Sequence, residues 1–156
     1  MEIERRFLVG HGAPLADARS VDRIEQGYLA IDADGTEVRV RRRGGETTLS
    51  VKSGAAGRTR LEEELPIDAD RYERLWPLTQ GRRLEKDRHL IALPGGLTAE
   101  LDIYTGSLAG LCIVEVEFAD EAAGERFRVP AWFGREVTDE QRYRNRELAV
   151  RGRPDD

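Results

Sequence analysis

Apolar and polar residues alternate along most of the chain with a period of two, the pattern of strands with one buried face. This alternation predicts eight strands, at residues 2–9, 22–31, 36–43, 46–53, 58–66, 85–92, 97–104 and 112–119. Turn signals such as Asp34-Gly35 and Gly44-Gly45 separate several of them. Eight strands in succession with little helix between them predict a mainly β fold, built on an antiparallel sheet or barrel.

Helical patterns are few and short. Residues 68–78 begin with acidic residues and place large apolar side chains on one side, which predicts a helix. A second, shorter helix is predicted at 120–127. Thr138 and Gln141 have the spacing of a capping box before a helical turn, and Asn145 is placed to cap another short helix.

The two faces of the predicted strands differ in charge, because residues i, i+2 and i+4 of a strand point the same way. Arg39 and Arg41 share one face of their strand, for example, and Val38 and Val40 lie on the other. Charged doublets of this kind recur on at least six strands. Near-pure doublets of one sign repel each other modestly, so an opposite strand or a bound ion must offset the repulsion.

Two architectures fit this pattern. In the first, the charged faces are solvated outer surface and the apolar faces form the core. In the second, the charged faces line a water-filled bore, and the apolar faces are covered by helices or by a second copy of the chain, which would make a homodimer. The bore would hold eight acidic residues: Glu2, Glu4, Glu62, Glu64, Glu100, Asp102, Glu115 and Glu117. It would also hold seven basic residues: Arg6, Arg39, Arg41, Lys52, Arg60, Lys86 and Arg88.

Such a bore would be stable because its acidic and basic residues nearly balance, whereas an excess of buried charge of one sign would cost folding free energy. The basic groups would grip a polyanion, and the carboxylates would hold a divalent metal against it. Only Lys52 and Lys86 among the 25 basic residues are lysine, and both fall on the charged faces. Lysine is a compact charge whose pKa is easily tuned, so its selective use there hints at chemistry that arginine does not perform.

Composition limits the other possibilities. The 156 residues are 39% hydrophobic and 35% charged, which predicts one globular domain over residues 1–156. The net charge of −5 disfavours nucleic-acid and membrane-surface partners, and the charged N-terminus has no apolar signal core, so we expect a cytoplasmic protein. With Cys112 as the single cysteine and two histidines, a metal here would be a hard ion held by oxygen.

Segments along nearly the whole chain resemble the CYTH domains, or triphosphate tunnel metalloenzymes. EIERRFLV at 2–9 is similar to their N-terminal Glu-x-Glu-x-Lys signature. The further matching segments are QGYLA at 26–30, EVRVRRRG at 37–44, TLSVKSG at 48–54, EEELP at 62–66, AELDIYTGSLAGL at 99–111, VEVEF at 114–118 and WFGREVTDEQRYRNRELA at 132–149. The ordered set is most similar to short bacterial members, many of which act on inorganic tripolyphosphate.

The resemblance implies a closed eight-stranded antiparallel barrel whose charged tunnel binds a triphosphate with Mg²⁺ or Mn²⁺. The metal ligands it implies are Glu2, Glu4, Glu115 and Glu117. The substrate-binding residues it implies are Arg6, Arg39, Arg41, Lys52, Arg60, Lys86 and Arg88, with Tyr28 beside them. The candidates for catalysis are Glu4, Lys52, Lys86, Glu115 and Asp102. Either a second metal or a carboxylate such as Glu115 or Asp102 would orient and activate water. Supporting positions near the metal or water are Glu62, Glu64 and Glu100.

Two positions bear on turnover and substrate choice. The lysine of the family signature is Arg6 in this chain. Arginine holds phosphate well but is effectively never deprotonated, so we expect an electrostatic role there and no proton-accepting one. Tyr28 either projects toward the tunnel and influences substrate choice, or simply packs within its strand.

The expected reaction is metal-dependent hydrolysis of inorganic tripolyphosphate to pyrophosphate and phosphate. The same family also includes adenylate cyclases of class IV type and thiamine or nucleoside triphosphatases, but the sequence has no clear aromatic base-stacking cluster. A polyphosphate-binding module without catalysis is a further alternative, favoured by Arg6 and opposed by the Glu-x-Glu pairs. An interaction domain with a solvated charged face is the last.

Overall fold

The structure is a computed structural model that describes residues 3–54 and 61–155. Within them the backbone forms one eight-stranded antiparallel sheet, in the order β1-β8-β7-β6-β2-β3-β4-β5. The strands are β1 Ile3–Leu8, β2 Ala18–Ile31, β3 Glu37–Arg43, β4 Glu46–Lys52, β5 Glu62–Pro66, β6 Arg83–Ala92, β7 Thr98–Thr105 and β8 Cys112–Phe118. Each predicted strand is therefore present, and the start of the 58–66 prediction lies outside the described residues.

The predicted helices at 68–78 and 120–127 are confirmed as α1 (Ala69–Leu75), which continues into the 3₁₀ turn Trp76–Thr79, and α2 (Glu121–Arg126). The carboxylates of Asp68 and Asp120 cap them by accepting hydrogen bonds from backbone amides three residues on. A third helix, α3, spans Asn145–Arg151.

The predicted helical turn is present as the 3₁₀ turn Gln141–Tyr143, and the short helix as α3, but both capping predictions are wrong. The Thr138 hydroxyl accepts a hydrogen bond from the backbone amide of Arg6 at 3.0 Å, so it holds the chain against β1 rather than starting a helix. Asn145 is the first helical residue of α3, whose preceding residue, Arg144, makes no side-chain cap. The side chain of Asn145 is used elsewhere, on buried groups of the sheet.

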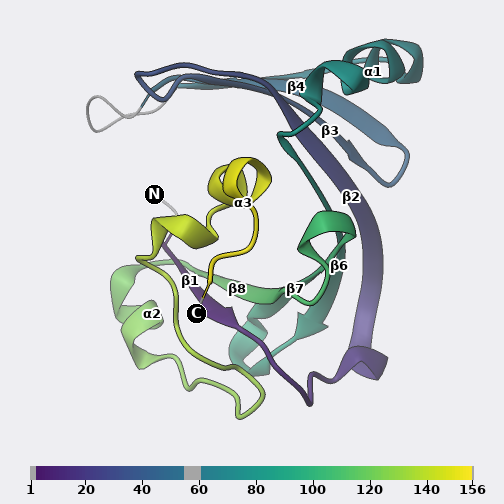
Figure 1. Ribbon diagram of the computed structural model, residues 1–156. Coiled ribbons are helices and arrows are strands. Elements are labelled where there is room, and N and C mark those ends of the chain that lie inside the picture. The colour runs from purple at the N-terminus through teal and green to yellow at the C-terminus, as the bar shows by residue number, and fades with distance from the viewer. Residues whose placement is uncertain (1–2, 55–60, 156) are drawn as a thin grey trace.

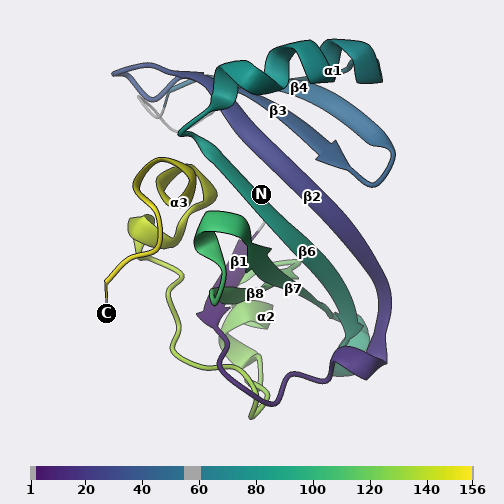
Figure 2. The same ribbon diagram turned by 45° about the vertical axis from the view of Figure 1, so that its right-hand side comes forward.

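The sheet curls strongly around α3 (Figure 1). The long strand β2 runs through its middle and pairs with β6 on one side and β3 on the other, with a bulge between Tyr28 and Ala30. In both views α3 lies inside the curve, whereas α1 covers the outer side of β3 and β4 (Figure 2). The concave face and α3 therefore bound the interior of the molecule.

The sheet does not close into the predicted barrel within the described residues. β5 pairs with β4 alone, and the outer edge of β1 pairs with a C-terminal segment instead of with β5. The amide of Leu8 donates to the carbonyl of Arg135 at 2.8 Å, and the amide of Val137 donates to the carbonyl of Arg6 at 2.8 Å. Because this segment occupies the edge that a barrel would need, the sheet is an open, curved one.

Apolar side chains pack in two clusters. One lies on the outer side of β1, β8 and β7, where Phe7, Leu101 and Phe118 meet aromatic residues of the segment after α2. The other lies between the concave face and α3, and includes Tyr104 and Leu148. On the outer side of β4 and β5 some apolar residues are exposed. The prediction that a second copy of the chain covers this face therefore stays a prediction. None of the helices in the described chain is long and apolar enough to cross a membrane.

Candidate active site

An acidic cluster forms where β1 and β8 pair. The register sets Glu4 opposite Glu117 and Arg6 opposite Glu115. Carboxylate oxygens of Glu4, Glu115 and Glu117 all lie within 4.8 Å of one another. The Arg6 guanidinium lies 3.0 Å from Glu115 and 3.5 Å from Glu4. Three of the four predicted metal ligands thus meet, and the fourth, Glu2, lies outside the described residues.

Crowding of negative charge perturbs this cluster. A hydrogen bond with Glu115, together with burial and the charge of Glu115, raises the pKa of Glu4 to about 8. Although burial opposes it, the hydrogen bond from Glu4 and the charge of Arg6 lower the pKa of Glu115. Hard oxygen donors gathered this closely are the kind of ligand set that suits Mg²⁺ or Mn²⁺.

A basic wall, made of Arg39 and Arg41 on β3 and Lys52 on β4, stands on the same concave face. Arg39 is 9% exposed, and its buried Nε has no hydrogen-bond partner in the described part of the chain. Burial and the neighbouring Arg39 lower the pKa of Arg41. The Lys52 ammonium lies 3.8 Å from Glu62. A buried guanidinium with an unused donor, beside a second cation, is an arrangement that an anion would relieve.

A buried ion-pair group lies between β6 and β7. The Asp102 carboxylate is 2.8 Å from the Lys86 ammonium and receives two hydrogen bonds from Arg88, at 2.8 and 2.9 Å. Arg88 also pairs with Glu100 at 3.0 Å. Although burial opposes it, Lys86 and Arg88 lower the pKa of Asp102, and burial lowers the pKa of Lys86. Both oxygens of Asp102 are therefore engaged with cations, which favours charge pairing over activation of water.

A cavity of about 510 Å³ reaches from Glu4, the one residue of the acidic cluster that lines it, to two residues of the basic wall. Glu4, Arg6, Arg39 and Lys52 line it, and so does Tyr28, which is 2% exposed. Tyr28 therefore lines the cavity and also packs in the apolar cluster under α3, and its influence on substrate choice stays a prediction. Burial, followed by the charge of Glu37, raises the pKa of its hydroxyl.

The opposite side of this cavity comes from the C-terminal segment, which the sequence reasoning left out of the site. Its lining residues are Thr138, Gln141, Arg144, Asn145, Arg146 and Glu147. Glu37 of β3 was also missed, although it shares a face with Arg39; it is 5% exposed and lies 3.4 Å from Arg146. The three arginines at every second position, Arg142, Arg144 and Arg146, were a usable signal for the C-terminal part.

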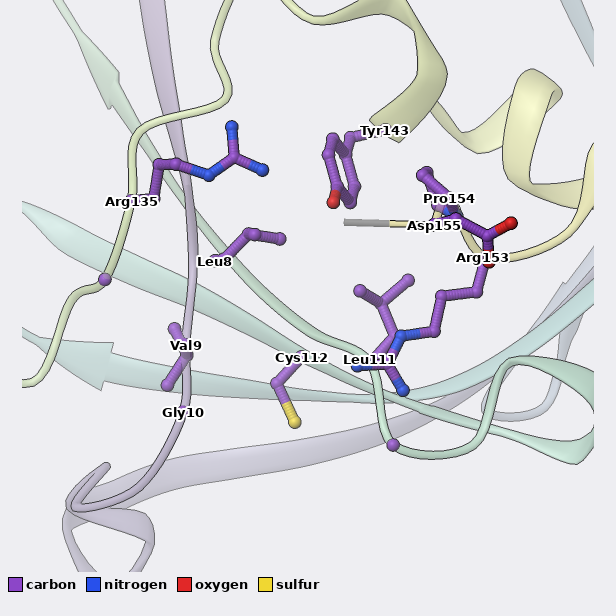
Figure 3. A pocket seen from close by; sticks show the side chains of 12 residues that line it. Leu8, Val9, Gly10, Leu111, Cys112, Arg135, Tyr143, Arg153, Pro154 and Asp155 are labelled. Atoms are coloured by element: carbon purple, nitrogen blue, oxygen red, sulfur yellow. The ribbon is translucent and has the colours of Figure 1, made fainter.

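Other predicted site residues lie at the margin. Glu62 and Glu64 are on the exposed strand β5, where Glu64 lies 3.5 Å from the Ser50 hydroxyl. Arg60 lies outside the described residues. A separate cavity of about 600 Å³, between β1, β8 and the C-terminal tail, is lined by Leu8, Cys112, Tyr143 and their neighbours (Figure 3). Among the described residues, no predicted site residue lines it.

Comparison with known proteins identifies relatives over nearly the full length. The chain is 45% identical over 149 residues to an inorganic triphosphatase of Nitrosomonas europaea, covering 96% of this chain and 97% of that protein. It is 38% identical to an inorganic triphosphatase of Acetivibrio thermocellus, covering 94% and 92%. This chain belongs to the inorganic triphosphatase family. The resemblance to CYTH triphosphatases is thereby confirmed.

Solved structures agree with membership of the inorganic triphosphatase family. A crystal structure of an inorganic triphosphatase superimposes with a TM-score of 0.81 at 42% identity, covering 96% of this chain and 95% of that one. A Hippeastrum protein, studied as an adenylyl cyclase and found to have a dominant triphosphatase activity, superimposes with a TM-score of 0.55 at 15% identity over 80% of this chain and 83% of that one, which shows the shared fold alone. No family model matches the chain.

Proposed function

We propose that this protein hydrolyses inorganic tripolyphosphate to pyrophosphate and phosphate with the help of Mg²⁺ or Mn²⁺. The observation that carries the proposal is one cavity lined both by Glu4 of the acidic cluster and by Arg39, whose buried Nε has no hydrogen-bond partner in the described part of the chain. A linear polyanion with a divalent cation has this distribution of charge. The relatives named as inorganic triphosphatases support the same substrate.

Glu4, Glu115 and Glu117 would hold the cation. When bound, the cation neutralises phosphate charge and polarises the reacting phosphoanhydride. The fit rests on three oxygen donors within 4.8 Å of one another, and on the hydrogen bond with Glu115, the burial and the charge of Glu115 that together raise the pKa of Glu4. Glu2 remains a proposed further ligand.

Arg39, Arg41 and Lys52 would bind the phosphate oxygens and fix the chain of the substrate in register. This positioning removes much of the entropic barrier to attack by water. Arg6 lies between Glu4 and Glu115 and keeps those carboxylates in place. Arg88 and Lys86 contribute positive potential from beneath, and Asp102 holds both of them in fixed orientations.

A water molecule would attack the terminal phosphorus as the bond to the bridging oxygen breaks. Pyrophosphate leaves with the electrons of that bond, and the proton of the water passes to a carboxylate. Of the two carboxylates predicted for this role, Asp102 is the less suited, because both of its oxygens are bonded to cations, whereas Arg6 bonds a single oxygen of Glu115. Nucleoside and thiamine triphosphates are less favoured, since Tyr28 is the single aromatic residue among the described residues that line the cavity.

The test measures phosphate release from tripolyphosphate, ATP and thiamine triphosphate, each with Mg²⁺, Mn²⁺ or a chelator. We expect metal-dependent release that is fastest with tripolyphosphate. Arg39→Gln should weaken tripolyphosphate binding about tenfold or more, whereas Arg71→Gln, on the exposed helix α1, should behave as wild type. Binding without turnover of any substrate would point to a binding module and refute the proposal, and full activity in chelator would refute the role of metal.

A further inference from the structure

The side chain of Asn145 contacts groups from two strands, and the mechanism proposed above gives it no role. It is the only asparagine in the sequence, and it opens α3, the helix inside the curved sheet. Its side-chain oxygen accepts a hydrogen bond from the Tyr104 hydroxyl at 2.9 Å and another from the Lys86 ammonium at 3.4 Å. The Lys86 ammonium also lies 5.3 Å from the centre of the Tyr104 ring. Residues of β6, β7 and α3 therefore converge on one amide.

These two donors fix the orientation of the amide. Lys86 is 1% exposed and Tyr104 is 3% exposed, so both are buried groups that need their partners. An ammonium and a hydroxyl that is already hydrogen-bonded as a donor can meet only the oxygen of an amide, since its nitrogen is itself a donor. The Oδ1 atom must therefore face Lys86 and Tyr104, and the Nδ2 atom must face the other way.

Asn145 is also one of the residues that line the cavity. Asn145 lines the same space as Arg6, Arg39 and Lys52, whereas Lys86 is not among the described residues that line it. Asn145 thus lies between the buried Lys86 and the place proposed for the triphosphate. An amide nitrogen offers two donors without adding charge, which suits an oxygen of a phosphate already surrounded by arginines.

We propose that Asn145 is a substrate-positioning residue of the C-terminal helix, which binds a phosphate oxygen of tripolyphosphate through Nδ2 while Lys86 and Tyr104 hold its Oδ1. This inference rests on the proposed function and deepens it. It gives α3 a part in recognition of the substrate, and it explains why a buried lysine that does not line the cavity bears on the site. Lys86 acts on the ligand through the amide that it orients.

The decisive variant is Asn145→Asp, which keeps the shape and the oxygen that Lys86 and Tyr104 require. It replaces only the donor toward the cavity, by a carboxylate oxygen. The melting temperature of the ligand-free variant should match the wild type, because the buried partners are retained. The dissociation constant for tripolyphosphate, measured by calorimetry with and without Mg²⁺, should rise tenfold or more, and KM should rise with it.

Gln141→Glu is the matched control, since Gln141 lines the same cavity and the substitution also turns an amide into a carboxylate. It should weaken binding less than threefold. Tyr104→Phe removes one of the two groups that hold the amide and leaves the cavity charge unchanged. It should weaken binding about threefold to tenfold, which a residue that only packs α3 against the sheet would not produce once the folded fraction is matched.

The possible outcomes distinguish failure of the role proposed for Asn145 from failure of the proposed function. Unchanged affinity in Asn145→Asp, with a wild type that binds and hydrolyses tripolyphosphate, would overturn the inference and leave the proposed function standing. An equal loss in Gln141→Glu would also overturn it, because charge anywhere in the cavity would then suffice. A wild type that neither binds nor hydrolyses tripolyphosphate would overturn the proposed function and the inference together.

Discussion

The acidic cluster should make the metal-free protein less stable than it would be without one of its charges. Glu4, Glu115 and Glu117 hold oxygens within 4.8 Å of one another, with Arg6 as their nearby cation. Replacing Glu4 by glutamine keeps the hydrogen bond to Glu115 and removes one charge. We therefore predict that Glu4→Gln raises stability in chelator while it lowers activity.

The size of the effect follows from the spacing. At 4.8 Å, Coulomb's law gives about 1 kcal/mol per pair of charges in water and about 3.5 kcal/mol at an effective dielectric constant of about 20. The Glu4 side chain is 43% exposed, so solvent screening places the gain near the lower figure, at about 1–2 kcal/mol. For a chain of this length that corresponds to a rise in melting temperature of about 2–8 °C.

The effect has a definite dependence on pH. The pKa of Glu4 is raised from 4.5 to about 8 in the folded protein, so the folded state binds the proton more tightly than the unfolded state does. Wild-type stability therefore falls as pH rises from about 4.5 to about 8, and the deficit is complete above that range. The stabilisation by Glu4→Gln should be absent below pH 4.5 and largest above pH 8.

Thermal melts of both proteins in chelator, taken across this range of pH, measure the prediction. Glu63→Gln is the control, because Glu63 is an exposed glutamate of β5 outside the cluster. It removes the same charge from the whole molecule and should leave the melting temperature nearly unchanged. Equal stability of Glu4→Gln and wild type at pH 9 would refute the charge repulsion in the cluster. Full triphosphatase activity of the variant would refute the metal-binding role of Glu4.

Three further predictions concern the rest of the site. Asp102→Asn leaves Lys86 and Arg88 buried beside a neutral group, so it should cost about 3–5 kcal/mol in a denaturant melt, and a cost below about 1 kcal/mol would contradict the ion-pair description. Tripolyphosphate with Mg²⁺ at about 100 times the dissociation constant should stabilise the wild type by about 2.7 kcal/mol in thermal melts, and no shift at saturation would count against the cavity. Arg6→Lys should keep turnover within about threefold in the phosphate-release assay, because Arg6 meets a single Glu115 oxygen rather than both; a loss of more than tenfold would show that the guanidinium itself is needed.

Alternation along the chain was enough to predict the strands and their charged faces. The period-two pattern is local, so each strand could be located from its own residues, as β3 and β8 illustrate. Closure is not local. Either β5 or the segment around Arg135 could pair with the free edge of β1. The choice depends on the backbone hydrogen bonds of the folded protein, and no side-chain pattern predicts it.

The same distinction applies to the site. Glu4 and Glu117 were placed together through the resemblance to CYTH domains, and the antiparallel pairing of β1 with β8 sets them opposite each other. The engagement of Asp102 with Lys86 and Arg88 could not be foreseen, since the face alone does not say which opposite charges pair. Nor could the position of Asn145, because the packing of α3 inside the curve is a tertiary choice that its own seven residues do not encode.

Among the residues that the structure describes, β5 pairs along one edge with β4 and its other edge has no strand partner; such an edge invites another chain to add a strand. The sequence of β5, EEELP, counters this hazard. Glu62, Glu63 and Glu64 would bring three like charges against any identical edge, and Pro66 has no amide hydrogen to donate. The strand is also short, so an added strand could form only a few backbone hydrogen bonds with it. The molecule can therefore keep its binding face accessible without becoming a template for aggregation.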